Sequence, residues 1–311
     1  MIHVFYHGAD LDGLSSGAIA RYHFEDIKKE KIRMWPFNYG DNFPYSEINY
    51  GERVVMVDIT KQPYEEMEKI NSEYNLFVID HHKTFIDHPI SKDISGVFKV
   101  GTAACQLTWN YYFDNKPIPG IINLLGQYDV WKNDDKIEWE EKIMPMQMGM
   151  RMQAADPNTE EGYKFWKSYL SLHLSTNLSS LRIADRISDN GKVILEYQKM
   201  VDSKTINMYA FEAEFEGMES ICMNSTHFSS QAFESIWDNT KYDIMVSWAN
   251  VKGEYYTVSL YTDKDYIDVS EIAKKYGGGG HMQAAGFQCA DINAIINSFG
   301  NKEIIVRKIA S

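Results

Sequence analysis

An α/β protein is the fold class that the sequence predicts, with a doubly wound parallel-sheet domain first, then a helical connector, then a smaller α/β domain. Short apolar strand-like segments alternate with amphipathic helical segments through the first half of the chain, which is the pattern of a parallel sheet covered by helices. From about Thr159 long helical stretches take over, and short strand-like segments return after Ser203. We therefore expect domains at residues 1–175 and 204–311, with the connector at 176–203.

Apolar periodicity and turn residues place the elements of the first domain. Pro36 restricts one of the four expected strands to an edge of the sheet or to a short length. The four strands are Ile2–Tyr6, Arg33–Phe37, Arg53–Val57 and Asn75–Ile79. Helices are expected at residues 14–24, 63–74 and 102–112 and after Pro119. Thr102 is the expected N-cap of the third helix.

The second half of the chain is assigned in the same way. Helices are expected at residues 163–172, 178–201, 228–237 and 269–275. The turn signal Asp189-Asn190-Gly191 is expected to interrupt the second of them. Strands are expected at residues 206–215, 219–223, 242–250 and 254–261, the last two as a hairpin.

Composition indicates a folded protein of two cores. The chain has 311 residues, of which 44% are hydrophobic and 14% aromatic. No apolar run approaches the ~20 residues that span a bilayer, and the N-terminus lacks the features of a signal peptide. The three cysteines show no CxxC spacing, which predicts reduced thiols in a cytoplasmic protein without a membrane segment. Three tryptophans are expected in the cores, with platforms for base stacking as the alternative: Trp131, Trp166 and Trp237.

The charge of the chain restricts its partners. Asp and Glu number 44 against 31 Lys and Arg, for a net charge of −13. A protein that holds long duplex nucleic acid normally presents a basic surface to the phosphates. Bound divalent ions would offset part of this acidity. We still expect a small phosphate-bearing substrate or a few nucleotides, and not a long duplex.

Ligand-type side chains follow three of the expected strands, at the point where each strand ends. The clusters are His7-Gly-Ala-Asp10-Leu-Asp12-Gly13, Asp58, and Asp80-His81-His82, with Asp129 farther along the chain. Taken singly, they have structural alternatives: a surface turn, a helix N-cap and a buried histidine pair. The carboxyl ends of parallel strands, however, meet at one edge of the sheet, where ligands bind. Carboxylates mixed with imidazoles suit Mn, Fe, Co or Mg-type ions, and paired ions of this kind hydrolyse phosphate esters.

A run of glycines in the second domain is a candidate phosphate-binding segment. Glycines permit positive φ angles and close approach of the backbone, so the N–H groups of Gly278, Gly279 and Gly280 can cradle a phosphate, with His281 beside them. A flexible linker is the alternative. The small residues of Ala284–Gly286 favour an ordered loop.

In this order the clusters resemble the four motifs of the DHH phosphoesterase superfamily. Gly277-Gly-Gly-Gly-His281-x-x-Ala-Ala-Gly-Phe287 resembles the signature of its DHHA1-type C-terminal domain. The resemblance covers the whole chain, although two residues separate His7 from Asp10 where many members have three. The two-domain length is most similar to the nanoRNase/oligoribonuclease group, whose members degrade short oligonucleotides, pAp, pNp, or small cyclic and linear dinucleotides.

The resemblance implies two divalent metal ions, with Mn²⁺ expected and Mg²⁺, Co²⁺ or Fe²⁺ as alternatives. One ion would be held by His7, Asp10 and Asp58. The second would be held by Asp12, Asp58, His81 and Asp129. Asp58 would bridge the two ions, and a water activated between them would be the nucleophile.

The resemblance also implies roles for the remaining motif residues. His82 would face the substrate phosphate, Asp80 would orient the histidines, and the segment Gly278–His281 would bind the substrate. The expected function is hydrolysis of very short oligonucleotides or small nucleotide esters such as nanoRNA, pApA or pAp. The alternatives are an inorganic pyrophosphatase or exopolyphosphatase, which would present a Lys/Arg-rich clamp in place of the glycines, and a non-catalytic nucleotide-binding regulator. The cleavage polarity, the choice of RNA or DNA and the oligomeric state, a homodimer included, stay open.

Overall fold

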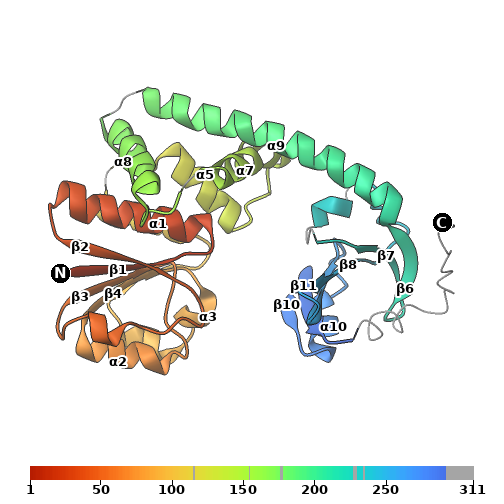
Figure 1. Ribbon diagram of the computed structural model, residues 1–311, viewed down its shortest axis with the longest axis horizontal. Coiled ribbons are helices and arrows are strands. Elements are labelled where there is room, and N and C mark those ends of the chain that lie inside the picture. Colours follow the sequence, from red (N-terminus) through yellow and green to blue (C-terminus); the bar gives the residue numbers. More distant parts are fainter. Residues whose placement is uncertain (115, 154, 176–177, 227–229, 234, 292–311) are drawn as a thin grey trace. The chain divides into compact units, whose positions relative to one another are not determined.

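This computed structural model describes residues 1–114, 116–153, 155–175, 178–226, 230–233 and 235–291. The chain forms two compact units, Met1–Leu195 and Glu196–Ser311. Helix α9, Ser179–Tyr209, runs across the boundary between them (Figure 1). Among the described residues, no helix is both long and apolar enough to cross a lipid bilayer.

A five-stranded, all-parallel sheet forms the centre of the first unit, and the sequence predicts four of its strands but not β5. Its strands follow the order β2-β1-β3-β4-β5. They are β1 Ile2–His7, β2 Ile32–Phe37, β3 Arg53–Val57, β4 Asn75–Asp80 and β5 Gly96–Phe98. The strand order reverses between β1 and β3, and in open α/β sheets the crevice at such a reversal is where ligands bind.

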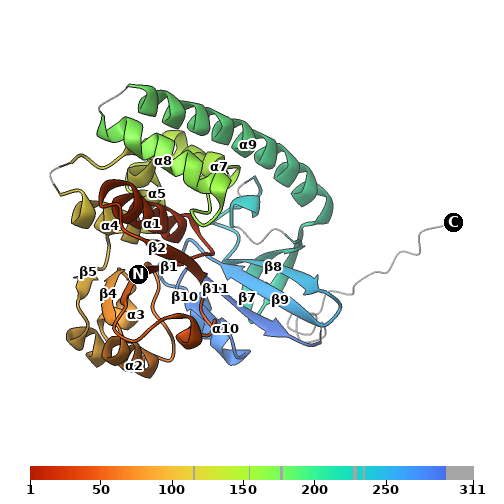
Figure 2. The same ribbon diagram turned by 60° about the vertical axis from the view of Figure 1, so that its left-hand side comes forward.

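Helices cover both faces of this sheet. In both views α1, α5, α7 and α8 lie on one side, and α2 and α3 lie on the other (Figure 1, Figure 2). The helices of the unit, with π-helical or 3-10 turns marked η, are α1 Leu11–Arg21, η1 Tyr22–Ile27, η2 Tyr45–Glu47, α2 Glu65–Glu73, α3 Lys83–Ile86, η3 Pro89–Asp93, α4 Ala104–Tyr112, α5 Gly120–Asp129, α6 Lys136–Glu138, η4 Trp139–Ile143, α7 Met144–Arg151 and α8 Glu160–Leu174.

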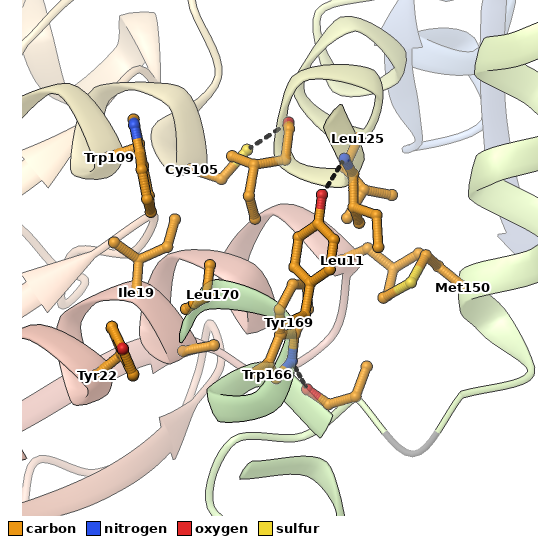
Figure 3. Packing of buried hydrophobic residues seen from close by; sticks show 14 of the residues in the cluster. Leu11, Ile19, Tyr22, Cys105, Trp109, Leu125, Met150, Trp166, Tyr169 and Leu170 are labelled. Atoms are coloured by element: carbon orange, nitrogen blue, oxygen red, sulfur yellow. Dashed lines mark hydrogen bonds between the residues drawn. The ribbon is translucent and has the colours of Figure 1, made fainter. Parts of the chain in front are cut away.

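The sheet is buried on both faces, which fixes the alternation of its side chains. Phe5 packs with the α2 residues Met67 and Ile70, whereas its neighbours Val4 and Tyr6 pack on the opposite face with α1 and α4. A further core between the helices contains aromatic side chains whose polar atoms are hydrogen-bonded (Figure 3). There the indole N–H of Trp166 donates to the Ala155 carbonyl at 2.8 Å, and the Tyr169 hydroxyl accepts from the Ile121 N–H at 3.0 Å.

Several predicted boundaries of the first unit are wrong. Helix α4 begins at Ala104 and its cap residue is Ala103, so Thr102 is not the N-cap. No interruption occurs at residues 189–191, because α9 is one helix of 31 residues. Gly191 is small for a packing reason, since a Cβ there would overlap the Pro145 carbonyl. Trp131 is not a core residue, because 58% of it is exposed.

The second unit contains a six-stranded mixed sheet of order β10-β11-β9-β8-β7-β6. Only β7 and β8 pair in parallel, and the expected hairpin is formed by β8 and β9. The elements are β6 Phe211–Phe215, β7 Met218–Asn224, η5 Ser230–Phe233, β8 Ile244–Val251, β9 Tyr255–Tyr261, α10 Val269–Lys275, β10 Gly279–His281 and β11 Ala284–Cys289.

Two predictions for this unit fail in part. Residues 206–209 belong to α9, so the expected strand 206–215 begins only at Phe211. Of the expected helix 228–237, residues 228, 229 and 234 lie outside the described residues, and Ser230–Phe233 forms a 3-10 turn. The α/β character of both units nevertheless confirms the predicted fold class.

Candidate metal centre

The predicted ligands of the first unit gather at the carboxyl edge of the parallel sheet. His7 ends β1, Asp58 directly follows β3, and Asp80 ends β4 with His81 and His82 after it. The ends of β1 and β3 lie at the reversal of strand order. The side chains therefore meet where a sheet of this topology leaves a crevice.

Ligand atoms of these residues lie within 4.8 Å of one another in three groups. The groups are His7 with Asp10 and Asp58, Asp12 with His81 and Asp129, and Asp58 with His81 and His82. All six predicted metal ligands take part, and Asp58 and His81 each belong to two groups. The first two groups correspond to the two ion sites that the sequence motifs imply.

Asp58 lies between those two sites. It is 1% exposed, and its Oδ2 lies 3.6 Å from His7 Nδ1 while its Oδ1 lies 3.2 Å from His81 Nε2. Its backbone adopts a left-handed conformation with φ of 60°, and its N–H donates to the Ile79 carbonyl at 2.9 Å. Asp and Asn tolerate this conformation better than other residues with side chains. The turn thus holds one carboxylate against both groups.

The carboxylate of Asp12 is held by the beginning of helix α4. Oδ2 accepts from the Ala104 N–H at 2.9 Å, and Oδ1 accepts from the Cys105 N–H at 2.8 Å. The positive end of a helix dipole favours a negative charge there. Asp12 is buried, and its Oδ2 also lies 3.5 Å from His81 Nε2.

The Asp10 carboxylate is fixed locally as the N-cap of α1 and accepts from the Gly13 N–H at 2.8 Å.

Asp80 orients His82. The fully buried Asp80 accepts through Oδ1 from the backbone N–H groups of His81 and His82, at 2.7 and 3.2 Å. The same oxygen lies 2.7 Å from His82 Nδ1. An Nδ1–H that donates to Asp80 leaves Nε2 as the ring atom of His82 available to a ligand. Although burial opposes protonation, the Asp80 carboxylate raises the pKa of His82 above its usual value.

The electrostatics of the site favour a bound cation. Burial, with repulsion from Asp58, raises the pKa of Asp12 to about 7. Burial, with repulsion from Asp12, raises the pKa of Asp129 to about 7. The Asp10 and Asp58 carboxylates raise the pKa of His7 to about 10. Carboxylates and imidazoles thus share protons here because they are crowded together, and a divalent ion would take the place of those protons.

Buried atoms without regular hydrogen bonds support the same conclusion. Among the described residues, His7 Nδ1, Asp58 Oδ1 and Asp80 Oδ2 are buried without a hydrogen bond of normal geometry, although His7 Nδ1 lies 2.8 Å from Asp10 Oδ2 and Asp58 Oδ1 lies 3.2 Å from His81 Nε2. His7 Nδ1 and Asp58 Oδ1 belong to the groups above, where lone-pair atoms converge without hydrogen-bond geometry. Buried polar atoms in folded proteins are nearly always paired or bound to an ion. The mixture of carboxylate oxygens and imidazole nitrogens fits Mn²⁺ or a similar ion.

Tyr39 is a site residue that the sequence motifs do not include. Its ring packs edge-on against His7 and His82, with centroid separations of 5.6 and 6.2 Å, and it is 44% exposed. Burial of the hydroxyl, together with the nearby Asp80 and Asp58 carboxylates, raises the pKa of Tyr39. Tyr39 follows β2, the neighbour of β1. Once the strand order is known, Tyr39 can be recognised as a site residue because it follows a strand at the carboxyl edge, where ligands bind.

In the second unit the predicted substrate-binding glycines belong to a β-hairpin. Gly279, Gly280 and His281 form the edge strand β10, which pairs with Gly286, Ala285 and Ala284 of β11. The N–H of Gly278 donates to the Ala273 carbonyl at 2.9 Å and so ends helix α10. That N–H is therefore already engaged.

Space around the three glycines differs. A Cβ on Gly279 would meet nothing within 4 Å, whereas a Cβ on Gly278 would overlap the Gly286 carbonyl. Gly280 has φ of 143°, and a Cβ there would lie 2.6 Å from the Ala284 carbonyl. Gly279, which has open space beside it, and His281, which is exposed, are accordingly the residues of this segment that a ligand could approach.

Comparison with known proteins gives two relatives, both longer than this chain. The chain is 28% identical to the oligoribonuclease NrnB of Bacillus subtilis over 331 residues, covering 94% of this chain and 73% of the relative. It is 27% identical to an uncharacterized protein of Acanthamoeba polyphaga mimivirus over 320 residues, covering 94% of this chain and 68% of the relative. No family model matches the chain.

A solved structure shares the fold. The pGpG-specific phosphodiesterase PggH of Vibrio cholerae superposes with a TM-score of 0.56 at 13% identity, over 94% of this chain and 95% of that one. The ordered motifs, the clustering of their side chains at one sheet edge, the fold and the related oligoribonuclease agree with one another. The chain is thus similar in sequence to an oligoribonuclease and in fold to a phosphodiesterase, in agreement with the resemblance to DHH phosphoesterases that its motifs show.

Proposed function

We propose that the protein is a two-metal phosphodiesterase that hydrolyses very short oligonucleotides or small nucleotide esters. The observation that carries the proposal is the position of Asp58, within 3.2 Å of His81 and 3.6 Å of His7, between two groups of ligand atoms. His7 and Asp10 would complete one ion site, and Asp12, His81 and Asp129 the other. Ions held there would polarise a phosphate oxygen and lower the pKa of a water nucleophile.

The side chains around the ligands would position the substrate. His82, oriented by Asp80 through Nδ1, offers Nε2 to a non-bridging phosphate oxygen. Tyr39, packed against His7 and His82, can donate its hydroxyl to the same phosphate and excludes water from one side of the site. A tyrosine hydroxyl is protonated at neutral pH, and the raised pKa of Tyr39 extends to higher pH the range in which it remains a donor.

Two observations support short substrates. The net charge of −13 leaves little basic surface for a long strand. The relative from Bacillus subtilis is named an oligoribonuclease. In the second unit, the proposed substrate contacts are Gly279, through its backbone N–H group, and His281, through its imidazole.

An inorganic pyrophosphatase or exopolyphosphatase is less well supported by the second unit. Such an enzyme would need unpaired cations for several phosphates. The lysines next to the glycine segment are both paired: Lys274 Nζ lies 2.5 Å from Glu271, and Lys275 Nζ lies 3.0 Å from Glu216. The glycine segment thus lets a ligand approach the backbone closely, whereas a polyphosphate enzyme would present positively charged side chains there.

Turnover with Mn²⁺ on a substrate panel tests the proposal. The panel contains pApA, pAp, an RNA 20-mer, pyrophosphate and polyphosphate. We expect pApA or pAp to be hydrolysed with a kcat/KM at least about tenfold above the 20-mer and the inorganic substrates. Preference for pyrophosphate or polyphosphate would overturn the substrate class. Binding of pApA without turnover would instead identify a nucleotide-binding regulator.

A further inference from the structure

A group of aromatic rings, one of them exposed and two half-buried, adjoins the candidate metal ligand Asp129. Tyr128 and Trp139 stack with ring centroids 5.5 Å apart and an interplanar angle of 6°. Trp131 packs edge-on against both, at 4.9 Å from Trp139 and 6.1 Å from Tyr128. We call Tyr128, Trp131 and Trp139 the aromatic platform. All three rings belong to the first unit, as Asp129 does.

Trp131 occupies a backbone position that normally takes glycine. The N–H of Lys132 donates to the Gln127 carbonyl at 2.9 Å, and the N–H of Trp131 donates to the Tyr128 carbonyl at 3.0 Å. This pair of bonds is a Schellman motif that ends helix α5, and Trp131 lies at its left-handed position with φ of 54°. A side chain with a Cβ is strained there, and glycine is the preferred residue.

Burial does not compensate for this strain. Trp131 is 58% exposed, whereas Trp109 and Trp166 in the same unit are fully buried. An indole that is strained in its backbone and left largely in water contributes little to the stability of the fold. Residues of this kind concentrate at ligand-binding sites, where the strained geometry is retained because it places a side chain.

The platform lies within the reach of a nucleotide bound at the metal ligands. One residue separates Trp131 from Asp129, so their Cα atoms are at most about 7 Å apart. Asp129 Oδ2 lies 3.4 Å from His81 Nε2, inside the ligand group. A nucleotide whose phosphate is held by that group would therefore have its base close to the segment that carries Trp131.

We propose that the aromatic platform binds a nucleobase of the substrate by stacking, with Trp131 as the contacting ring. The proposal rests on the proposed function and assigns a base-binding subsite to the first unit. Every base has a flat π-face, so stacking on an indole gives affinity without base selectivity. The subsite would make the enzyme recognise nucleotides and not bare phosphate chains.

The matched variants separate stacking from folding. Trp131→Gly removes the ring at a position where glycine is the preferred residue, so helix α5 should still end correctly, and we expect the melting temperature to stay within about 3 °C of wild type. Trp131→Phe keeps an aromatic face. Tyr50→Ala removes another exposed ring, 82% exposed, at the amino end of β3 and hence at the opposite edge of the sheet.

Steady-state kinetics with Mn²⁺ provide the test. The substrates are pApA and its two abasic analogues, in which one base is replaced by hydrogen. Stacking is typically worth a fivefold to roughly 150-fold change in affinity per base. We expect Trp131→Gly to raise KM for pApA by about that factor with kcat nearly unchanged, Trp131→Phe to raise KM much less because it keeps an aromatic face, and Tyr50→Ala to stay close to wild type.

The abasic analogues identify the interaction. For the analogue that lacks the stacked base, wild type and Trp131→Gly should have equal KM values, because the variant and the substrate then remove the same contact. An equal rise of KM on all three substrates would show that Trp131 acts on the fold or on the metal ligands. No rise on any of them would overturn the proposal.

Failure of the proposed function has a different signature. If wild type hydrolyses none of these substrates, quenching of tryptophan fluorescence still tests the subsite, with adenosine monophosphate and ribose 5-phosphate as probes in the presence of Mn²⁺. Base stacking is supported if adenosine monophosphate quenches the fluorescence, ribose 5-phosphate does not, and the quenching disappears in Trp131→Gly. Equal quenching of wild type and variant, or none, overturns it.

Discussion

Replacement of Asp58 by Asn is the sharpest perturbation of the proposed two-ion site. Asn tolerates the left-handed backbone of this position, with φ of 60°, so the turn after β3 should persist. What changes is the charge of the oxygens that lie 3.2 Å from His81 Nε2 and 3.6 Å from His7 Nδ1. Because Asp58 lies between the two ligand groups, the affinity for both ions should fall together.

The magnitude can be worked out for stability and for rate. A ligand present at 100 times its Kd stabilises the folded state by about 2.7 kcal/mol. For a unit of this size each kcal/mol corresponds to about 2–4 °C in Tm. Saturating Mn²⁺ should therefore raise the Tm of wild type by roughly 5–10 °C and that of Asp58→Asn by less than about 2 °C. Loss of several kcal/mol of metal-ion catalysis should lower kcat/KM at least about a thousandfold.

Differential scanning fluorimetry with titrated Mn²⁺ and a pApA hydrolysis assay measure both effects. The matched control is Asp134→Asn, which removes an exposed carboxylate five residues after Asp129 and outside the ligand groups. The control should behave as wild type. A Mn²⁺-induced shift in Asp58→Asn equal to that of wild type, or activity within about tenfold of wild type, would refute the bridging role.

Three further predictions concern other parts of the chain. Asp80→Asn should lower kcat by about 10- to 100-fold with Mn²⁺ content unchanged by elemental analysis, because Asp80 orients His82; loss of the metal would contradict this. Gly279→Ala should leave the Tm of the second unit unchanged and raise KM for pApA, whereas Gly278→Ala should lower that Tm, because its Cβ would overlap a carbonyl; equal Tm losses would mean that the segment is structural. Burial, with nearby cations, lowers the pKa of His23 to about 4 from an unfolded value of about 6.5. The unfolded state therefore binds the extra proton first, and stability that is present above pH 6.5 is lost as the pH falls through 4, by at most about 3 kcal/mol. Urea unfolding of His23→Phe should show a flatter pH dependence over this range, and an unchanged slope would show that other groups are responsible.

The parallel sheet and its ligand edge could be predicted because they depend on local signals. Buried parallel strands are continuous apolar runs, and β3 occupies the predicted residues Arg53–Val57. A carboxylate at the end of such a run has few structural reasons to be there. The order of the strands then brings His7, Asp58 and Asp80 to one place without any further information from the sequence.

The predictions that failed depended on contacts between distant residues. Helix α4 starts after Ala103 because the carboxylate of Asp12, about 90 residues earlier in the chain, binds its first N–H groups. Gly191 suggested a turn, yet it is the point where α9 approaches the Pro145 carbonyl. Trp131 was assigned to a core by its residue type, although its helix ends in a conformation that exposes it.

The two hydrogen bonds that helix α4 donates to Asp12 have a consequence for the chemistry of any ion that Asp12 binds. Both of its oxygens already accept an amide proton from the first turn of α4. These protons, with the helix dipole behind them, withdraw electron density from the carboxylate and make it a weaker donor. A divalent cation bound to Asp12 would therefore retain more of its own charge than one held by unshared carboxylates. Helix α4 provides none of the ligands in these groups, yet through Asp12 it would adjust the Lewis acidity of an ion bound there.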